Sequence, residues 1–264
     1  MAVDNLSAQF HALHRAAQPL VLYNIWDAGS AAAVAASGAA AIATGSASVA
    51  AAQGFQDGQK IPLSNLLAVV EQICATVSLP VTVDFEGGYA EEETALASNI
   101  AQLLRWPIVG INFEDQIVGR SQLYPPEHQA GRIGAIRSEA NSAGIDLFIN
   151  ARTDLFLLND ATAHHEHLDE AIMRAEHYQR AGASGLFIPG IVDASLIKRI
   201  CDAVQLPVNI MMKPGVPSLD RLTEIGVARV SHGPFPFLDL MQNLQHQAQA
   251  ALAGSTDQRG DSST

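Results

Sequence analysis

The ten residues 80–89, PVTVDFEGGY, decide how this chain is expected to fold. An apolar run rich in β-branched residues ends in Asp84 and Glu86 and is then broken by two glycines. Side chains alternate between the two faces of a strand, so Asp84 and Glu86 are predicted to point the same way. The stretch therefore predicts a buried strand that presents two carboxylates at its carboxyl end.

Two later stretches repeat this design. Residues 109–115, VGINFED, end in Glu114 and Asp115, and residues 146–154, DLFINARTD, place Arg152 near their end. Successive parallel strands would bring these groups to the same end of a sheet. Carboxylates followed by an arginine suit a hard cation and an anionic substrate, so the sequence predicts such a site.

Strand-like and helix-like segments alternate along the whole chain, which is typical of a parallel sheet with helical crossovers. Eight such units closed on themselves give a (β/α)8 TIM barrel, and 264 residues is a typical length for that fold. An open doubly wound sheet is the alternative, but no Gly-x-Gly-x-x-Gly follows the first strand. The expected strands are 19–24, 39–43, 80–84, 109–113, 147–151, 185–188, 208–211 and 227–230.

We expect residues 1–253 to form one barrel domain with two extra helices. A helix over 5–18 is expected to cover the closed end of the barrel, and the small, polar residues 254–264 are typical of a disordered tail. A final helix over about 236–251 carries an apolar stripe at helical spacing. We expect the stripe to be buried between subunits, and packing on the rim of its own barrel is the alternative. The stripe comprises Phe237, Leu238, Leu240, Met241, Leu244 and Ala248.

The composition limits the partners of the protein. The formal net charge is −12 with only 15 Lys and Arg residues, which argues against nucleic-acid binding because phosphates require clustered cations. No run approaches the ~20 apolar residues that span a bilayer, and residues 1–15 lack the core of a secretory signal. Cys74 and Cys201 lie far apart in helical patterns, so neither a disulfide nor a zinc site is expected. We therefore expect a soluble, cytoplasmic protein that acts on a small molecule.

Three carboxylates at strand ends lie close enough in the strand order to converge. Asp84, Glu86 and Glu114 are the predicted ligands of Mg²⁺ or Mn²⁺, because small hard cations take carboxylate oxygens and keep several waters. The alternative is that these acids accept hydrogen bonds from neighbouring loop amides. Trp26, after the first strand, is expected to form a wall of the pocket.

Seven short motifs occur in order along the chain. They are NIWDAGS (24–30), TGSA (44–47), GFQDG (54–58), DFEGGY (84–89), NFED (112–115), ARTD (151–154) and FIPG (187–190). Together they resemble the isocitrate lyase/phosphoenolpyruvate mutase superfamily, nearest to its short members labelled carboxyvinyl-carboxyphosphonate phosphorylmutase-like. The likeness extends from Val21 to Pro234, and several motifs agreeing in order are more specific than any one.

The resemblance implies a barrel that binds Mg²⁺ and a small α-oxo or 2-hydroxy acid and breaks a C–C or P–C bond through an enolate. It implies that Asp84 is the main metal ligand and that Glu86 and Glu114 complete the coordination directly or through water. Many members carry Asp where this chain has Glu86. Asp57 would lie at the edge of the metal site, and Mg²⁺ and Arg152 would stabilise the charge that grows on the enolate oxygen.

The resemblance also implies how the substrate is held and how the subunits assemble. Ser46 and the amides near Gly45 and Ala47 would bind the substrate carboxylate, and Arg152 would bind the oxo acid or the developing oxyanion. Family members commonly exchange their final helix between barrels and form tetramers as paired dimers. A homotetramer is therefore implied here.

The loop after Glu114 departs from the family pattern. The C–C lyases carry a Lys-Lys-Cys-Gly-His motif there, and the phosphonate enzymes carry a Lys and an Asn. Residues 115–124 read DQIVGRSQLY, without Cys, Lys or Asn, which speaks against both isocitrate-type cleavage and the mutase reaction. Arg120, Ser121 and Tyr124 are candidates to replace these catalytic groups. The alternative, given equal weight, is that they are ordinary surface residues.

Two other interpretations stay open. Lys213, at a strand end, could form the Schiff base of a metal-free aldolase, which a chelator would distinguish from a metal enzyme. The altered loop also permits a barrel that binds an oxo acid as a sensor without turning it over. The histidines at 164, 165 and 167 are expected at a solvated helix start rather than at a metal site.

Overall fold

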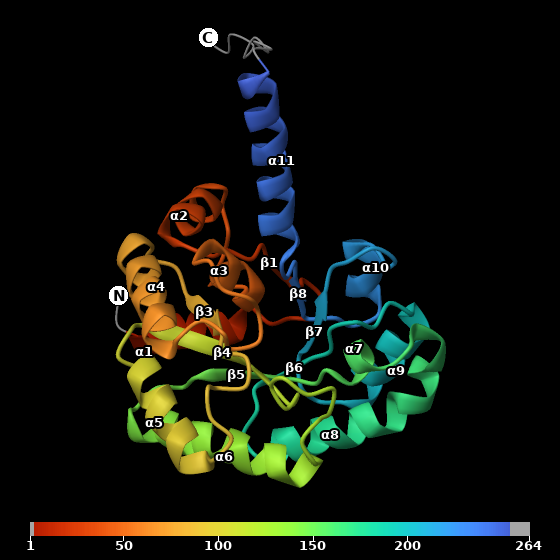
Figure 1. The fold of residues 1–264 in the computed structure, drawn as a ribbon. Coiled ribbons are helices and arrows are strands. Elements are labelled where there is room, and N and C mark those ends of the chain that lie inside the picture. Colours follow the sequence, from red (N-terminus) through yellow and green to blue (C-terminus); the bar gives the residue numbers. More distant parts are fainter. Residues whose placement is uncertain (1–2, 254–264) are drawn as a thin grey trace.

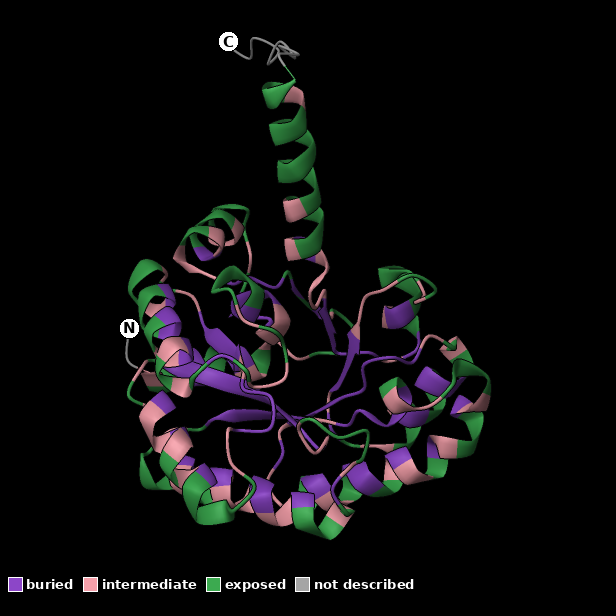
Figure 2. Cartoon of the chain, viewed as in Figure 1, coloured by how far each residue is buried: buried purple, intermediate pink, exposed green. Residues whose placement is uncertain are grey.

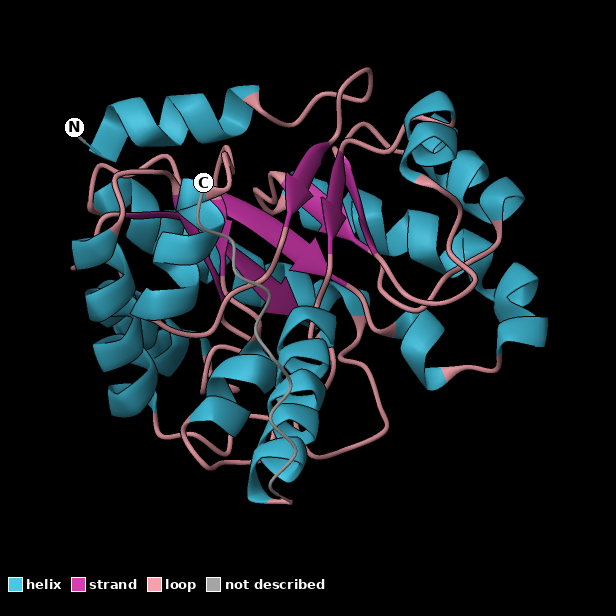
Figure 3. Cartoon of the chain, turned by 90° about the horizontal axis from the view of Figure 1, so that it is seen from above, coloured by secondary structure: helices cyan, strands magenta, loops and turns pink. Residues whose placement is uncertain are grey.

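The computed structural model describes residues 3–253, and the expected tail at 254–264 lies outside the described residues. Eight parallel strands form one sheet in the order β1-β8-β7-β6-β5-β4-β3-β2, which follows the chain around a ring. Most of the helices surround this ring on its outside (Figures 1 and 3). The predicted (β/α)8 TIM barrel is therefore confirmed.

Each strand is short and is followed by at least one helix. The strands are β1 (Leu20–Leu22), β2 (Ile42–Ala43), β3 (Val81–Asp84), β4 (Ile108–Glu114), β5 (Phe148–Arg152), β6 (Gly185–Phe187), β7 (Val208–Met211) and β8 (Arg229–Ser231). The helices are α1 (Val3–Ala12), α2 (Ala28–Ala36), α3 (Ser46–Ala52), α4 (Leu63–Thr76), α5 (Glu93–Leu103), α6 (Pro126–Ser142), α7 (Leu155–Leu158), η1 (Ala161–His167, a 3₁₀ helix), α8 (Leu168–Arg180), α9 (Ala194–Ala203), α10 (Leu219–Glu224) and α11 (Phe235–Leu252).

The ring closes just beyond the ends of β1 and β2. Ile25 and Thr44 form a parallel bridge there, and Ile25 N donates to Ala43 O at 2.8 Å. Gly45 N donates to Ile25 O at 3.1 Å, and Asn24 Nδ2 donates to Thr44 O at 2.8 Å. Closure leaves the sheet without a free edge. It also brings the first two motifs of the chain side by side.

The amino-terminal end of the barrel interior is apolar. Here α1 covers the strands and packs Phe10 edge-on against Phe148, with ring centroids 5.4 Å apart. The predicted helix over the closed end is therefore confirmed, although it ends at Ala12 rather than at residue 18. The buried residues of this cluster are Leu6, Phe10, Leu20, Leu22, Ala41, Ala43, Val109 and Phe148.

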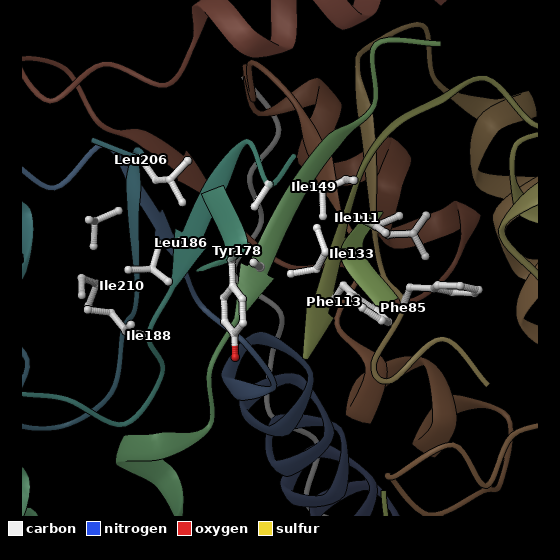
Figure 4. Close-up of a cluster of buried hydrophobic side chains, with 14 of the residues drawn as sticks. Phe85, Ile111, Phe113, Ile133, Ile149, Tyr178, Leu186, Ile188, Leu206 and Ile210 are labelled. Carbon is white, nitrogen blue, oxygen red and sulfur yellow. The ribbon is translucent and has the colours of Figure 1, made fainter. Parts of the chain in front are cut away.

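The main core lies between the strands and the outer helices. Figure 4 shows Ile111 and Phe113 of β4 beside Ile133 of α6, and all three are fully buried. Burying a side chain of this size contributes about 1.5–3 kcal/mol, so this shell is the main source of stability. Strand residues alternate between faces, so the residues between these, such as Asn112, point into the barrel.

The structure differs from the sequence prediction at two short helices. Helix α3, Ser46–Ala52, lies between the second and third expected strands and forms because most of its residues are alanine, which has the highest helix propensity. Helix α7, Leu155–Leu158, has only four residues, too few for a helical period to be visible. All eight predicted strands are present, with ends shifted by a few residues at most.

The prediction for the histidines is wrong at His164. Its side chain is buried, packs edge-on against Phe156 with ring centroids 5.0 Å apart, and places Nε2 3.2 Å from Asn159 O. His165, its neighbour, is exposed. In a 3₁₀ helix every third residue faces the same side. One histidine of the cluster can therefore face the core while its neighbour faces solvent.

Helix α11 extends away from the barrel and is exposed along most of its length (Figures 1 and 2). Of its residues only Pro236 is buried, and Leu240 and Leu244 are 48% and 57% exposed. At its base Phe237 packs edge-on against Trp26, with ring centroids 5.1 Å apart. The predicted apolar stripe is therefore present and largely uncovered within a single chain.

Cys74 and Cys201 are free thiols that pack against the main core, as expected for helical core residues. Burial raises the pKa of each thiol to about 12. Within residues 3–253, no helix is both long enough and apolar enough to cross a membrane.

His14 makes the stability of the barrel depend on pH. Its ring stacks on Phe148 with centroids 3.9 Å apart, and its Nδ1 lies 2.8 Å from Phe10 O. Burial, and next the charge of Arg229, lower the pKa of His14 from 6.5 to about 3. The unfolded chain takes up a proton below pH 6.5 that the folded chain does not accept until about pH 3. Stability is therefore lost as the pH falls through this window.

We expect the free energy of unfolding to fall by roughly 2 kcal/mol more between pH 7 and pH 5 in the wild type than in His14→Gln. Urea titrations at the two pH values measure this difference. His246→Gln, on the exposed part of α11, is the control and should keep the pH dependence of the wild type. If His14→Gln and wild type depend on pH equally, the assigned pKa shift of His14 is wrong.

Candidate active site

A cavity of about 200 Å³ lies at the carboxyl ends of the strands. A wider depression of about 710 Å³ lies between the end of α1 and α2, but Arg15 is the only charged residue among the described residues that line it. The smaller cavity holds several charged groups and is the candidate active site. Its lining comprises Asn24, Gly45, Ser46, Ala47, Asp57, Asp84, Asn112, Arg152, Leu157, Phe187, Pro189, Met211, Ser231, Gly233 and Pro234.

The structure brings together one part of the predicted site and leaves another part outside the cavity. The predicted residues that line it are Gly45, Ser46, Ala47, Asp57, Asp84 and Arg152. The predicted residues that do not line it are Trp26, Glu86, Glu114, Arg120 and Ser121.

Asp84 is fixed at the end of β3 by the segment that follows the neighbouring strand β2. Its backbone N donates to Thr44 Oγ1 at 2.8 Å, and its Oδ2 accepts from Ser46 N at 3.1 Å. Its other oxygen, Oδ1, is the only buried carboxylate oxygen among the described residues without a hydrogen-bond partner. Buried polar atoms are rarely left unpaired, so Oδ1 is the atom best suited to receive a cation.

Asp57 reaches the same cavity from the loop between α3 and α4. Partial burial, and next the carboxylate of Asp84, raise its pKa above the ordinary value. A second carboxylate so close to Asp84 is unfavourable unless a positive charge lies between them.

Glu86 does not continue β3. The strand ends at Asp84, and Glu86 has a left-handed φ of 49° in the turn that follows. The prediction that both carboxylates leave one strand on the same face is therefore wrong, because the turn begins before the paired glycines. Glu86 Oε2 accepts from Gln59 N at 2.8 Å, which ties down the loop that carries Asp57. Burial, and next Asp84 and Asp57, raise the pKa of Glu86 to about 7.

Arg152, at the end of β5, is held between two carboxylates. Its Nε and Nη2 donate to Asp154 Oδ1 and Oδ2 at 2.5 and 2.9 Å, and its Nη1 lies 3.0 Å from Glu114 Oε2. Burial opposes the charge of Arg152, but Glu114 and Asp154 raise its pKa well above the ordinary value. Burial raises the pKa of Glu114, and Arg152 opposes that shift. A guanidinium has more N–H groups than these contacts use, so the remainder can bind an anion in the cavity.

Asp154 was not foreseen as a site residue, and a buried network holds it in place. Its backbone N donates to Asp115 Oδ1 at 3.0 Å. Asp115 Oδ2 accepts from Tyr178 Oη at 2.7 Å and from Arg174 Nη1 at 3.2 Å, both on α8. The repeated Asp at the ends of the NFED and ARTD motifs was the available signal, but sequence spacing alone does not show which acid supports which.

Arg120 and Ser121 lie at the exposed tip of the loop after β4. The tip is held by Arg120 N donating to Ile117 O at 2.9 Å and by Gln116 Nε2 donating to Arg120 O at 2.9 Å. Neither side chain reaches the cavity in this arrangement. Tyr124, at the end of the loop, is buried and stacks with His128.

Two further residues lie apart from the cavity. Trp26 packs against α11 and lines a separate groove beside α2 rather than the wall of this cavity. Lys213 Nζ lies 3.5 Å from Gly190 O and does not line the cavity.

Asn24, Asn112 and Ser231 line the cavity and were not among the predicted site residues. Asn24 Oδ1 accepts from the backbone N of His232 and of Gly233, both at 2.9 Å, which holds the loop after β8 against β1. The available signal was a polar residue at an inward position of an otherwise apolar strand. That signal is weak until the strand register is known.

The residues present fit a cation that takes few protein ligands. Within the described residues, no three Asp, Glu, His or Cys side chains form a cluster ready to hold a metal. Mg²⁺ commonly binds one or two carboxylates and keeps its waters, so Asp84 Oδ1 with Asp57 nearby is a sufficient donor set.

The chain matches the phosphoenolpyruvate phosphomutase family over residues 10–252. An uncharacterized protein of Mycobacterium tuberculosis is 35% identical over 245 residues, which cover 93% of this chain and 89% of that protein. The 2-methylisocitrate lyase of Escherichia coli (strain K12) is 29% identical over 153 residues, which cover 55% of this chain and 49% of the lyase.

Solved structures agree with these matches. A provisionally named phosphonomutase from Burkholderia cenocepacia J2315 is 44% identical with a TM-score of 0.92, covering 95% of this chain and 100% of that one. A phosphonopyruvate hydrolase solved with oxalate and Mg²⁺ has a TM-score of 0.84 at 17% identity, covering 98% of this chain and 91% of that one. At this low identity the likeness supports a shared fold and nothing more. The named relatives are lyases, mutases and decarboxylases. The chain therefore belongs to the phosphoenolpyruvate phosphomutase family, a family of enzymes. This family lies within the isocitrate lyase/phosphoenolpyruvate mutase superfamily that the motifs of the chain resemble.

Proposed function

We propose that this protein is a Mg²⁺-dependent lyase or hydrolase that cleaves a C–C or P–C bond of a small α-oxo or 2-hydroxy carboxylic acid through an enolate. One observation carries the proposal. The unpartnered Oδ1 of Asp84 and the doubly clamped guanidinium of Arg152 share one cavity of about 200 Å³. That volume suits an acid of few carbon atoms, since pockets for drug-sized ligands measure roughly 300–1,000 Å³.

The acidic side of the cavity favours a divalent cation. Asp57, Asp84 and Glu86 lie near one another, and their mutual repulsion contributes to the raised pKa values of Asp57 and Glu86. Asp84 would bind Mg²⁺ directly, and Asp57, Glu86 and Glu114 would hold its water ligands. When bound, Mg²⁺ would act as a Lewis acid that stabilises negative charge on the substrate oxygens.

The cationic side of the cavity orients the substrate. Arg152 is rigid because Asp154 pairs with its Nε and Nη2 and Glu114 pairs with its Nη1, which leaves one N–H on each Nη free. Its free edge can hold a carboxylate or the oxygen on which enolate charge develops, without moving during the reaction. Ser46 and the amides near Gly45 and Ala47 line the cavity beside Asp84 and would bind the substrate carboxylate.

Asp57 is the candidate group for proton transfer. Asp57 has a raised pKa and already faces the cavity, so it is a candidate acid or base. Arg120 and Ser121 would contribute only after the loop tip moves toward the cavity. The Schiff-base alternative is disfavoured because Lys213 does not line the cavity. A barrel that only binds an oxo acid is the remaining alternative. Detection of turnover with any acid of the panel described below would exclude it.

Replacing Asp84 should abolish both turnover and stabilisation by the metal. We expect Mg²⁺ to raise the melting temperature of the wild type by several degrees, since saturation at about 100 times Kd contributes roughly 2.7 kcal/mol. Asp84→Asn should show no such rise while it keeps the fold. Thermal melts with MgCl₂ or with EDTA measure the effect.

Asp202→Asn, which alters an exposed pair with Lys198 on α9, is the matched control and should respond to Mg²⁺ as the wild type does. The same EDTA treatment should stop turnover of an oxo-acid panel that contains oxaloacetate, 2-methylisocitrate, isocitrate, phosphonopyruvate and 2,3-dimethylmalate. Full activity in EDTA would instead favour the Schiff-base chemistry of Lys213.

Arg152→Lys should lose activity although it keeps the positive charge. An ammonium cannot pair with Asp154, Glu114 and the substrate in the planar geometry that a guanidinium provides. We expect kcat/KM to fall by roughly 10²–10³, the usual cost of removing a donor that stabilises transition-state charge. Arg180→Lys, in an exposed pair with Glu176, is the control for the same chemical change. Near-normal kcat/KM in Arg152→Lys would remove Arg152 from the mechanism.

We also propose a homotetramer, assembled as a dimer of dimers, in which α11 packs on a neighbouring barrel. The support is that Leu240 and Leu244 are largely exposed in the single chain. A groove lined by Trp26, Val34 and Leu240 adjoins the base of the helix. A cytoplasmic location stays a prediction from the sequence.

The double variant Leu240→Glu/Leu244→Glu should dissociate the tetramer, because charges would replace the apolar stripe. Gln245→Glu adds a charge to the same helix outside the stripe and should leave assembly unchanged. Sedimentation velocity at micromolar concentration distinguishes these results. A wild-type protein that sediments as a folded monomer would refute the assembly.

A further inference from the structure

A layer of polar side chains separates the apolar closed end of the barrel from the active-site cavity. It consists of Asn112 on β4, Asn150 on β5, Asn209 on β7 and Arg229 on β8, and we call it the amide layer. All four residues are buried, with at most 6% exposure. Asn112 is the member that also lines the cavity.

Arg229 is expected to lower the stability of the fold at this position. Among the described residues it forms no ion pair, and its Nε and Nη1 have no hydrogen-bond partner. Its guanidinium lies 5.9 Å from the ring centroid of Phe10, and burial lowers its pKa to about 9. The charge of Asp84 opposes the lowering of this pKa, but no carboxylate in the described part of the chain is in contact with Arg229, and such a buried charge costs stability that an apolar residue of similar length would avoid. Stability therefore does not explain why an arginine is here.

Within residues 3–253, the one side-chain hydrogen bond of Arg229 fixes the orientation of Asn112. Arg229 Nη2 donates to Asn112 Oδ1 at 3.0 Å. A guanidinium can only donate, so the oxygen rather than the nitrogen of the amide must face it. Asn112 Nδ2 has no partner among the described residues, and its side chain lines the cavity. The donor end of Asn112 is therefore left free at the cavity.

The same constraint passes along the layer to Ser231. Asn150 Nδ2 donates to Asn112 Oδ1 at 2.9 Å and to Asn209 Oδ1 at 3.0 Å. Asn209 is thereby turned so that its Nδ2 donates to Ser231 Oγ at 3.2 Å. Ser231 Oγ accepts that bond and keeps its own proton for another acceptor, and it too lines the cavity.

We propose that Arg229 is a positioning residue that, through the amide layer, fixes Asn112 Nδ2 and Ser231 Oγ as hydrogen-bond donors to an oxyanionic group of the substrate. The group is a carboxylate or enolate oxygen, because it must accept bonds and has none to donate. The inference rests on the proposed oxo-acid function and assigns two further contacts within that site. It also accounts for the arginine, because a guanidinium donates hydrogen bonds and never accepts them.

The test compares variants that separate orientation from packing. Arg229→Met removes the donor, and Arg229→Lys keeps a group that only donates, while both lose the guanidinium. Asn112→Asp keeps an acceptor toward Arg229 but removes the donor toward the cavity. Ser231→Ala removes the second donor. Thr82→Val is the control, because Thr82 Oγ1 is a buried, unpartnered hydroxyl of the barrel interior outside the layer.

Binding of oxalate in the presence of MgCl₂, measured by calorimetry, is the readout, together with the melting temperature of each variant. We expect Arg229→Met and Asn112→Asp to bind oxalate at least roughly tenfold more weakly, as for a lost hydrogen bond to a charged group. Ser231→Ala should lose several-fold, and Arg229→Lys should stay within about threefold of wild type. Asn112→Asp should also melt no lower than wild type, because it gives Arg229 a carboxylate partner. Thr82→Val should bind normally.

Three results would overturn the inference, and the third can be distinguished from the first two. If wild type binds oxalate and Asn112→Asp binds it equally well, the amide layer is structural and the proposed function stands. The same conclusion follows if Arg229→Met and Arg229→Lys weaken binding equally. If wild type neither binds oxalate nor turns over the oxo-acid panel, the proposed function fails and the inference fails with it. Asn112→Asp and Ser231→Ala decide the matter if the Arg229 variants do not fold.

Discussion

The clamp around Arg152 is the interaction on which the open end of the barrel depends. Two carboxylates from adjacent strand ends, Glu114 and Asp154, hold one buried guanidinium. Asp154 is in turn held by Asp115, which is bonded to Tyr178 and Arg174 on the outer helix α8. Removing one partner of such a network leaves a buried charge unpaired, which is strongly destabilising. The strand ends are therefore rigid, and the loop tip at 116–123, which lies outside this network, can vary without moving the site.

The barrel interior is organised in three levels that differ in how polar groups are satisfied. At the closed end, Phe10 and Phe148 form an apolar contact that needs no hydrogen bonds. In the middle, amides pair with one another and with Arg229, which lacks a carboxylate partner. At the open end, Arg152 has two carboxylate partners. Stability is thus concentrated where no ligand binds, and charge is concentrated where the ligand is expected, a division typical of TIM barrels.

The sequence predicts the architecture well because hydrophobic periodicity repeats eight times and each repeat supports the others. It predicts Asp84 and Arg152 as site residues for a similar reason, since each ends a strand whose register is set by burial. It fails at Glu86, where a turn starts one step before the glycines that should announce it. It also misses Asn112 and Ser231, because one inward polar residue in an apolar strand becomes meaningful only once the neighbouring strands are aligned. The periodicity of one strand carries no information about its contacts with strands that are distant in sequence.

The two sides of the cavity constrain which small acids fit the proposed function. One side of the cavity carries the carboxylates of Asp57 and Asp84. The other side presents the hydrogen-bond donors of Arg152, Asn112 and Ser231. A substrate must therefore offer acceptor oxygens to both sides at once, to a cation on one and to fixed donors on the other. Adjacent carboxylate and oxo oxygens meet that requirement within a few bonds, whereas an amine or an unsubstituted alcohol meets only part of it. Because the donors are held by strands and not by mobile loops, they need little reorganisation as charge moves onto the substrate oxygen. Preorganisation of this kind is the principal source of electrostatic catalysis.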